Sequence, residues 1–102
     1  MKNPLKEIVK RIIEETNPDK IILFGSRAKG EDKKWSDYDL CVLKSSPVKR
    51  NDLEKRIYLK LFGVGVPIDI IVEIMERFEE LKENRFLIHY EIARYGRTIY
   101  EK

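Results

Sequence analysis

The chain has 102 residues, of which 42% are hydrophobic and 38% charged, and its 21 basic and 18 acidic residues give a formal net charge of +3. This length and hydrophobic content predict one folded domain over residues 1–102 and exclude an intrinsically disordered chain. The charge is too evenly mixed to indicate a nucleic-acid-binding protein by itself.

The sequence also bears on the compartment in which the protein works. Its apolar runs are only a few residues long, far below the roughly 20 that span a bilayer, and its first residues do not resemble a signal peptide. Cys41, the single cysteine, lies in an apolar run, which favours a buried thiol in a reducing compartment. We therefore expect a cytoplasmic protein without membrane association. The many Lys, Glu and Ile residues, and the absence of Gln, are typical of thermophiles.

The first part of the sequence predicts a helix followed by a buried strand. Asn3 as N-cap and Pro4 at the first helical position begin a helix that Asn17-Pro18 ends. Its apolar residues recur with helical spacing at Leu5, Ile8, Val9, Ile12 and Ile13. The continuous apolar run 20–24 then predicts a strand buried on both faces, which ends at Gly25-Ser26.

The rest of the sequence alternates strands with helices. Strands are predicted over residues 38–43 and 66–72, separated by a helix that Asn51 caps and Gly63 ends, and residues 98–100 predict a short edge strand. Apolar residues at helical spacing mark the helices: Leu53, Ile57, Leu61 and Phe62, then Ile74, Phe78 and Leu81, then Ile88, Ile92 and Tyr95. The expected fold is α+β, a small mixed β-sheet with helices packed against it.

Three aspartates on the predicted strands are candidate metal ligands. Asp37 and Asp39 are two positions apart, so strand alternation directs both carboxylates to the same face. Asp69 interrupts an apolar strand, where an acid is costly without a partner. If the two strands are neighbours, the three acids gather, and clustered carboxylates suit Mg²⁺.

The end of the first strand is a candidate phosphate site. Gly25 lets the backbone approach a ligand, and Ser26 supplies a hydroxyl donor. If Ser26 opens a helical turn, its free N–H groups favour a phosphate chain. Arg27 adds positive charge at the same rim, although a solvated surface role is an equally good interpretation of this side chain.

These residues carry a family resemblance. Gly25-Ser26-Arg27-Ala28-Lys29-Gly30, a short polar loop, and then Ser36-Asp37-Tyr38-Asp39-Leu40 resemble the signature of the DNA polymerase β-like nucleotidyltransferase superfamily. Within it, the whole chain is similar to the minimal nucleotidyltransferase (MNT) domains found as antitoxins of HEPN ribonuclease toxins. The closing Glu91–Gly96 segment and Ile99-Tyr100-Glu101 are similar to the tail of those domains.

The resemblance implies the fold and the chemistry. Gly25 and Ser26 would hold the triphosphate of a nucleotide, ATP above others, while Asp37 and Asp39 would bind Mg²⁺ and Asp69 would complete the catalytic and metal site. It implies transfer of a nucleoside monophosphate to a hydroxyl, such as a tyrosine of a HEPN-type toxin, by an antitoxin. A homodimer or hetero-oligomer is compatible with a domain of this kind.

Other interpretations remain open. The chain is alternatively a binding subunit that neutralises a HEPN partner by contact with little catalysis. Nucleic-acid binding through the basic residues Lys33, Lys34, Lys44, Lys49 and Arg50 is disfavoured, because acids interrupt them. We expect His89 to be structural, Trp35 to pack over its loop, and Asp32 to face solvent.

Overall fold

The computed structural model describes residues 3–102, and within them four strands form one mixed sheet in the order β3-β2-β1-β4. In chain order the elements are α1 (Pro4–Thr16), β1 (Lys20–Phe24), α2 (Ser26–Lys29), β2 (Tyr38–Lys44), α3 (Arg50–Lys60), β3 (Ile68–Ile74), α4 (Met75–Leu81), α5 (Ile88–Tyr95) and β4 (Arg97–Glu101). β1 pairs antiparallel with both β2 and β4, whereas β2 and β3 run parallel. The predicted α+β fold with a small mixed sheet is confirmed.

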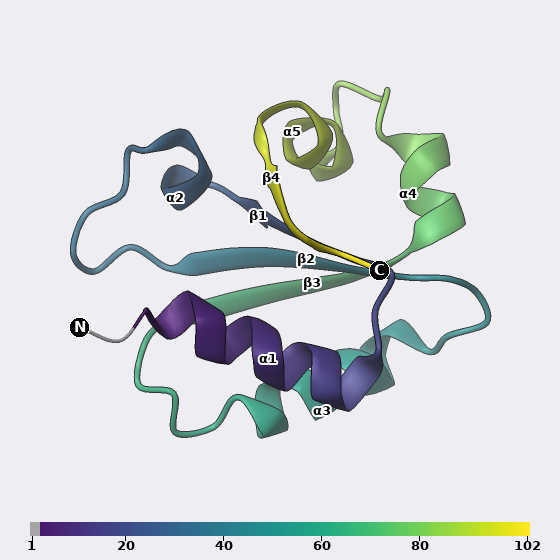
Figure 1. Ribbon diagram of the computed structural model, residues 1–102. Helices are drawn as coiled ribbons and strands as arrows, with labels where there is room; N and C mark the ends of the chain where they lie inside the picture. Colours follow the sequence, from purple (N-terminus) through teal and green to yellow (C-terminus); the bar gives the residue numbers. More distant parts are fainter. Residues whose placement is uncertain (1–2) are drawn as a thin grey trace.

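Helices cover both faces of this sheet. Figure 1 shows α1 and α3 on one face and α4 and α5 on the other, with α2 beside the end of β1. Alternation along β2 matches this arrangement: Leu40 and Val42 pack with buried residues of α1 and α3, while Cys41 and Leu43 pack with those of α4 and α5. Asp39 has the same parity as Cys41, so its side chain lies on the face of α4 and α5.

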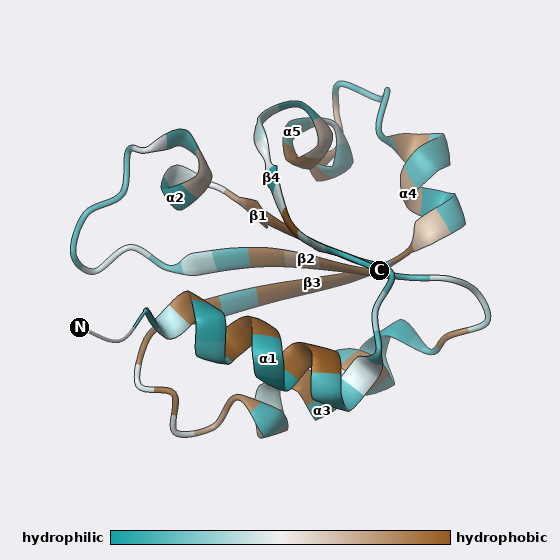
Figure 2. Cartoon of the chain, in the orientation of Figure 1, coloured by the Kyte–Doolittle hydropathy of each residue, from teal (hydrophilic) through white to brown (hydrophobic). Residues whose placement is uncertain are grey.

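The first helix shows how the sequence builds one of these layers. Asn3 accepts a hydrogen bond from the Leu5 N–H through its side chain (3.0 Å) and Pro4 opens the helix, as predicted. Ile8 and Ile12 of α1 are fully buried, and each contributes about 1.5–3 kcal/mol to folding. In Figure 2 the hydrophobic colours follow the strands and alternate with hydrophilic colours along α1.

Some predicted boundaries are wrong. The third strand begins at Ile68 instead of Val66, because Pro67 has no N–H to donate to a ladder, and it extends to Ile74, which was expected in the following helix. The central helix begins at Arg50 after an extended Lys49, so Asn51 lies inside it instead of capping it.

The end of the central helix also differs from the prediction. The helix stops at Lys60, so Gly63 lies beyond the position that ends it, and Phe62 is 87% exposed and outside the core. Of the helices described, not one combines the length and the apolar character that a bilayer crossing requires.

Candidate functional site

The parallel pairing of β2 with β3 brings two predicted acids together. Asp39 and Asp69 are direct partners in the register of these strands, so both side chains emerge on the same face at the same level of the sheet. Asp37 was predicted to lie on the strand. It lies instead one residue before β2 begins, and it is exposed. The strand adjacency on which the predicted acid cluster depends is therefore present.

The end of β1 brings the predicted phosphate site to the same place. Phe24, the last residue of β1, pairs with Asp39, so Gly25 follows directly beside this carboxylate. Gly25 has a φ of +73°, and a Cβ added to it would overlap Asp39 Oδ2. Only glycine combines this left-handed conformation with such a close approach. The site thus joins the Gly25-Ser26 turn to the acids without any intervening side chain.

The electrostatics of Asp39 reflect its neighbours. Burial of this carboxyl group raises its pKa, and the negative charges of Asp69 and then Asp37 raise it further. Each of these effects disfavours the charged form. A cation bound among the three acids would remove this penalty.

The donor chemistry of the three acids fits a divalent cation such as Mg²⁺, which prefers carboxylate oxygens. In the present side-chain conformations, however, no three His, Cys, Asp or Glu side chains within residues 3–102 lie close enough together to hold a metal ion. The backbone positions of Asp39 and Asp69 are fixed by the strands, whereas their side-chain torsions are free to adjust. Metal binding by these residues therefore requires side-chain movement.

A tyrosine that the sequence reasoning missed contacts the third acid. Tyr58 lies on α3, on the opposite face, and its hydroxyl donates to Asp69 Oδ1 (3.3 Å) while accepting from the Ile70 N–H (2.8 Å). Burial of Tyr58 raises its pKa, so the hydroxyl stays protonated and keeps its donor role at neutral pH. No local pattern predicts this contact, because it depends on how α3 packs along the edge of β3.

Arg27 follows Ser26 on α2, the short helix that the sequence predicted as a helical turn. Its Nε and Nη2 atoms both donate to the Ser36 carbonyl oxygen (3.1 and 2.9 Å), and its Nη1 pairs with Asp32 (3.1 Å). The guanidinium also lies 3.9 Å from the ring centroid of Tyr38. Arg27 thereby links α2 to the chain that leads into β2.

The loop between α2 and β2 confirms one expectation and corrects another. Asp32 is exposed, as expected, and it also pairs with Arg27 (3.1 Å). Trp35 was expected to pack over its loop, but it is 78% exposed. Lys29, also at this rim, pairs with Glu91 of α5 (2.7 Å), which ties α2 to α5.

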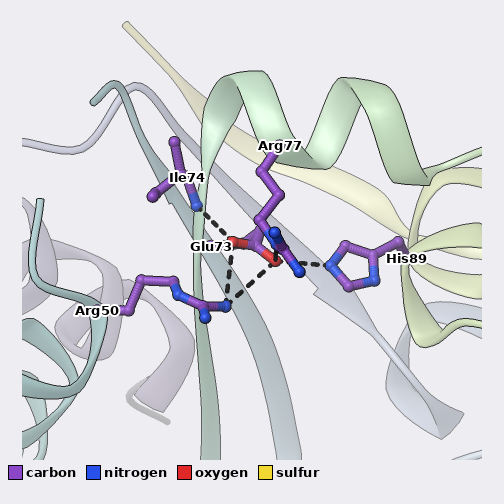
Figure 3. Close-up of polar contacts among 5 residues, drawn as sticks. All are labelled: Arg50, Glu73, Ile74, Arg77 and His89. Carbon is purple, nitrogen blue, oxygen red and sulfur yellow. Dashed lines mark hydrogen bonds and ion pairs between the residues drawn. The ribbon is translucent and has the colours of Figure 1, made fainter. Parts of the chain in front are cut away.

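A second polar cluster lies further along β3 on the same face, and Figure 3 shows its members converging on one carboxylate. Glu73 is only 2% exposed and accepts hydrogen bonds from Arg50 (3.2 Å) and the Ile74 N–H (2.8 Å). His89 Nε2 lies 2.8 Å and Arg77 Nε 3.5 Å from its Oε1. Burial alone would raise the pKa of Glu73, but the His89 and Ile74 hydrogen bonds and the Arg50 charge lower it. His89 thus belongs to this buried cluster through Nε2, while its Nδ1 is buried without a hydrogen-bond partner among the described residues.

A groove on the described part of the chain lies away from the acids. It runs between α1 and the turn before β3 and is lined by Asn3, Pro4, Lys6, Glu7, Lys10, Arg11, Gly63, Val64 and Val66. Because α1 covers the face opposite Asp39, this groove is separate from the acid site.

Comparisons with known proteins agree with this geometry. The sequence profile of the nucleotidyltransferase domain family matches residues 5–93. A search of curated proteins found no significant match. Among solved structures, a proposed nucleotidyltransferase from Sulfolobus solfataricus superposes with a TM-score of 0.67 at 20% identity, over 97% of this chain and 78% of that one.

Two further structural relatives come from toxin–antitoxin systems. A chain of a toxin–antitoxin solved with AMP-PNP has a TM-score of 0.61 at 17% identity, over 95% of this chain and 73% of that one. A chain of a variant of the toxin–antitoxin MntA–HpeT has a TM-score of 0.64 at 16% identity, over 99% and 75%. At these sequence identities the superpositions show that the fold is shared, and the match to the family profile shows membership of the family. The chain belongs to the nucleotidyltransferase domain family.

Proposed function

We propose that this protein transfers a nucleoside monophosphate, AMP from ATP above others, to a hydroxyl group of a partner protein. The observation that carries the proposal is the meeting of three strand ends. Asp39 and Asp69 face each other across parallel strands, and Gly25 lies against Asp39 at the end of β1. The family match adds support for transferase chemistry.

In this proposal the nucleotide lies between the Gly25-Ser26 turn and the acids. The backbone at Gly25 and the hydroxyl of Ser26 bind phosphate oxygens, and Arg27 lies at the same rim. Asp37, Asp39 and Asp69 would hold Mg²⁺ once their side chains turn toward one another, and the ion would supply positive charge to offset that of the triphosphate and the departing pyrophosphate.

The reaction is an in-line displacement at the α-phosphorus. The acceptor hydroxyl oxygen forms a bond to this phosphorus while the bond to the bridging β-phosphate oxygen breaks and pyrophosphate leaves. We propose Asp69 as the acceptor of the hydroxyl proton, and its position on edge strand β3, outside Asp39 in the sheet, supports this role. Asp39 lies inside the sheet and suits metal binding better than proton transfer.

The acceptor is proposed to be a tyrosine of a HEPN-type toxin, so that the protein acts as an antitoxin. Two structural relatives are chains of toxin–antitoxin assemblies, one of them solved with AMP-PNP. These relatives support a toxin partner and an adenine nucleotide for this chain. The sequence resemblance to MNT domains supports the HEPN class.

Ligand-dependent thermal stability tests the nucleotide site. The melting temperature is measured with ATP, with Mg²⁺ and with both, on the wild type, on Asp39→Asn and on Asp52→Asn as the matched control. Asp52 is an exposed acid on α3, on the opposite face of the sheet. At 100 times Kd, ATP with Mg²⁺ should raise the melting temperature by about 10 °C, and only Asp39→Asn should lose this shift.

The possible results separate the two candidate functions. A rise in melting temperature with ATP and Mg²⁺ together, lost in Asp39→Asn, supports the proposed transferase activity. It also justifies a search for AMP on a purified toxin by mass spectrometry. No shift at millimolar ligand would overturn the proposed enzyme. The binding-only antitoxin would then be favoured, in keeping with the open arrangement of the acids among the described residues.

A further inference from the structure

We propose that Arg27 is a positioning residue that fixes Asp37 relative to Asp39 and the Gly25-Ser26 turn, in place of a direct contact with phosphate. This inference rests on the proposed function, because it assigns a role to a residue of that same site. It concerns the loop of residues 30–37, which joins α2 to β2 and is named here the acid loop.

The contacts of Arg27 are concentrated on the residues around the acids. The Ser36 carbonyl, which accepts from two of its nitrogens, belongs to the residue immediately before Asp37. The Tyr38 ring, which packs against the guanidinium, belongs to the residue between Asp37 and Asp39. From a helix that begins at Ser26, Arg27 therefore contacts the residue on each side of Asp37, the backbone of Ser36 and the ring of Tyr38.

Most of the guanidinium is already engaged within the protein. Its three nitrogens each make a hydrogen bond, which uses three of the five N–H donors, one face lies against the Tyr38 ring, and the side chain is only 18% exposed. Its charge is also compensated by Asp32 at 3.1 Å. A phosphate that took over the engaged donors would displace these contacts and release the acid loop that they hold.

The acid loop has its own internal hydrogen bonds, which Arg27 completes. The Lys33 N–H donates to Ser36 Oγ (2.8 Å), and the Ser36 N–H donates to the Lys33 carbonyl (3.0 Å). These bonds close a turn. A backbone hydrogen bond from the Glu31 N–H to the Ser26 carbonyl (2.9 Å) ties the start of the loop to α2. Arg27 adds connections further along the loop, to Asp32 and to Ser36.

The planar fork of arginine is required for this role. Lysine keeps the positive charge but has one nitrogen, so it cannot bond Ser36 and Asp32 together while it packs flat on Tyr38. A phosphate-binding role depends mainly on charge and survives the change to lysine better. Arg27→Lys therefore distinguishes positioning from phosphate binding.

The experiment compares Arg27→Lys with Arg11→Lys as the matched control. Arg11 also donates to two backbone carbonyls, those of Lys60 and Phe62, but on the face opposite the acids. Two properties are measured on each full-length protein: amide hydrogen exchange of Lys33 and Ser36, and Mn²⁺ binding without nucleotide. Mn²⁺ is the probe because it replaces Mg²⁺ and is detected directly by electron paramagnetic resonance.

In Arg27→Lys we expect exchange of the Lys33 and Ser36 amides to accelerate about tenfold. We also expect Mn²⁺ affinity to fall about tenfold or more, the usual effect of losing a group that orients metal ligands. Arg11→Lys should change neither property. The opposite result would be wild-type amide exchange and wild-type Mn²⁺ affinity in Arg27→Lys, together with ATP binding that is weakened only in Arg27→Met, which lacks the charge. This result would overturn the proposal in favour of a phosphate contact.

Failure of the proposed function gives a different result. If the wild type binds neither Mn²⁺ nor ATP, the enzyme proposal fails, and the exchange measurement still decides the role of Arg27. Unchanged exchange at Lys33 and Ser36 in Arg27→Lys then overturns the positioning role, whereas faster exchange supports it. Circular dichroism melting of each variant confirms that the compared proteins are folded.

Discussion

Gly25 lies so close to Asp39 that a β-carbon at position 25 would overlap the Asp39 carboxylate. This contact joins the end of β1 to the start of β2, which is the place where the proposed nucleotide and cation meet. It also explains why the turn after β1 needs glycine for two reasons, its positive φ and the space beside it.

Gly25→Ala is expected to abolish binding of ATP with Mg²⁺, because the methyl group displaces the Asp39 side chain. Gly63→Ala is the matched control, since Gly63 also has a positive φ (+89°) but no neighbouring atom within 4 Å of the added Cβ. Both variants should lose about 1–3 kcal/mol of stability from the positive φ, with the larger loss in Gly25→Ala, because the ψ of −157° at Gly25 is adopted almost only by glycine. Only Gly25→Ala should lose the ligand shift in thermal melting, and equal ligand shifts in both variants would contradict this.

Asp39→Asn is expected to stabilise the protein in the absence of metal. The pKa of Asp39 is raised by burial and by Asp69 and Asp37, so its charged form weakens folding as the pH rises above the ordinary aspartate pKa. At pH 7 the melting temperature should rise by up to about 4 °C, and this gain should vanish as the pH falls below that pKa. A lower melting temperature than the wild type, with EDTA present, would rule out this electrostatic account.

Tyr58→Phe is expected to lower the free energy of unfolding by about 1 kcal/mol at neutral pH. It removes the acceptor of the Ile70 N–H and the donor to Asp69. Because burial raises the pKa of Tyr58, its contribution is complete below the ordinary tyrosine pKa and is lost as the pH rises through the raised value. Urea unfolding at pH 7 and pH 10.5 measures the free energy of unfolding of the wild type and of Tyr58→Phe. Tyr95→Phe, at an exposed position, is the control. Equal stability losses in the two variants would refute the contact.

Glu73→Gln is expected to lower the free energy of unfolding by about 1–3 kcal/mol. The loss is limited because Arg50 and Arg77 are 47% and 55% exposed, so their charges reach solvent once the carboxylate is gone. The pKa of Glu73 is lowered, so the stability it contributes is present above the ordinary glutamate pKa and is lost as the pH falls toward the lowered value.

Urea unfolding from pH 7 down to pH 3 measures this difference between the wild type and Glu73→Gln. Glu80→Gln, at an exposed position on α4, is the control. The wild type should lose its advantage over Glu73→Gln across this range. An advantage that stays constant with pH would mean that packing, and not charge, makes Glu73 stabilising.

Much of the site was predictable because it depends on local patterns. The Gly25-Ser26 turn, the pair Asp37 and Asp39, and Asp69 in an apolar strand are short-range features, and strand alternation alone assigns side chains to faces. The first helix was equally predictable from the sequence, since the Asn3 cap and Pro4 both act within its first turn. The boundary error at Val66 arose because Pro67 cannot donate to a strand ladder, and the error at Asn51 because a helix start is uncertain by one or two residues.

The sequence by itself thus determined the elements, the faces of the acids and the family signature, because each depends on residues close together in the chain. Only the tertiary structure decided which strands became neighbours and with what register, and so placed Asp39 opposite Asp69. It also decided the partners of side chains that cross between elements, as Tyr58 does from α3 to Asp69. Such contacts are set by the packing of segments far apart in sequence, for which no local pattern exists.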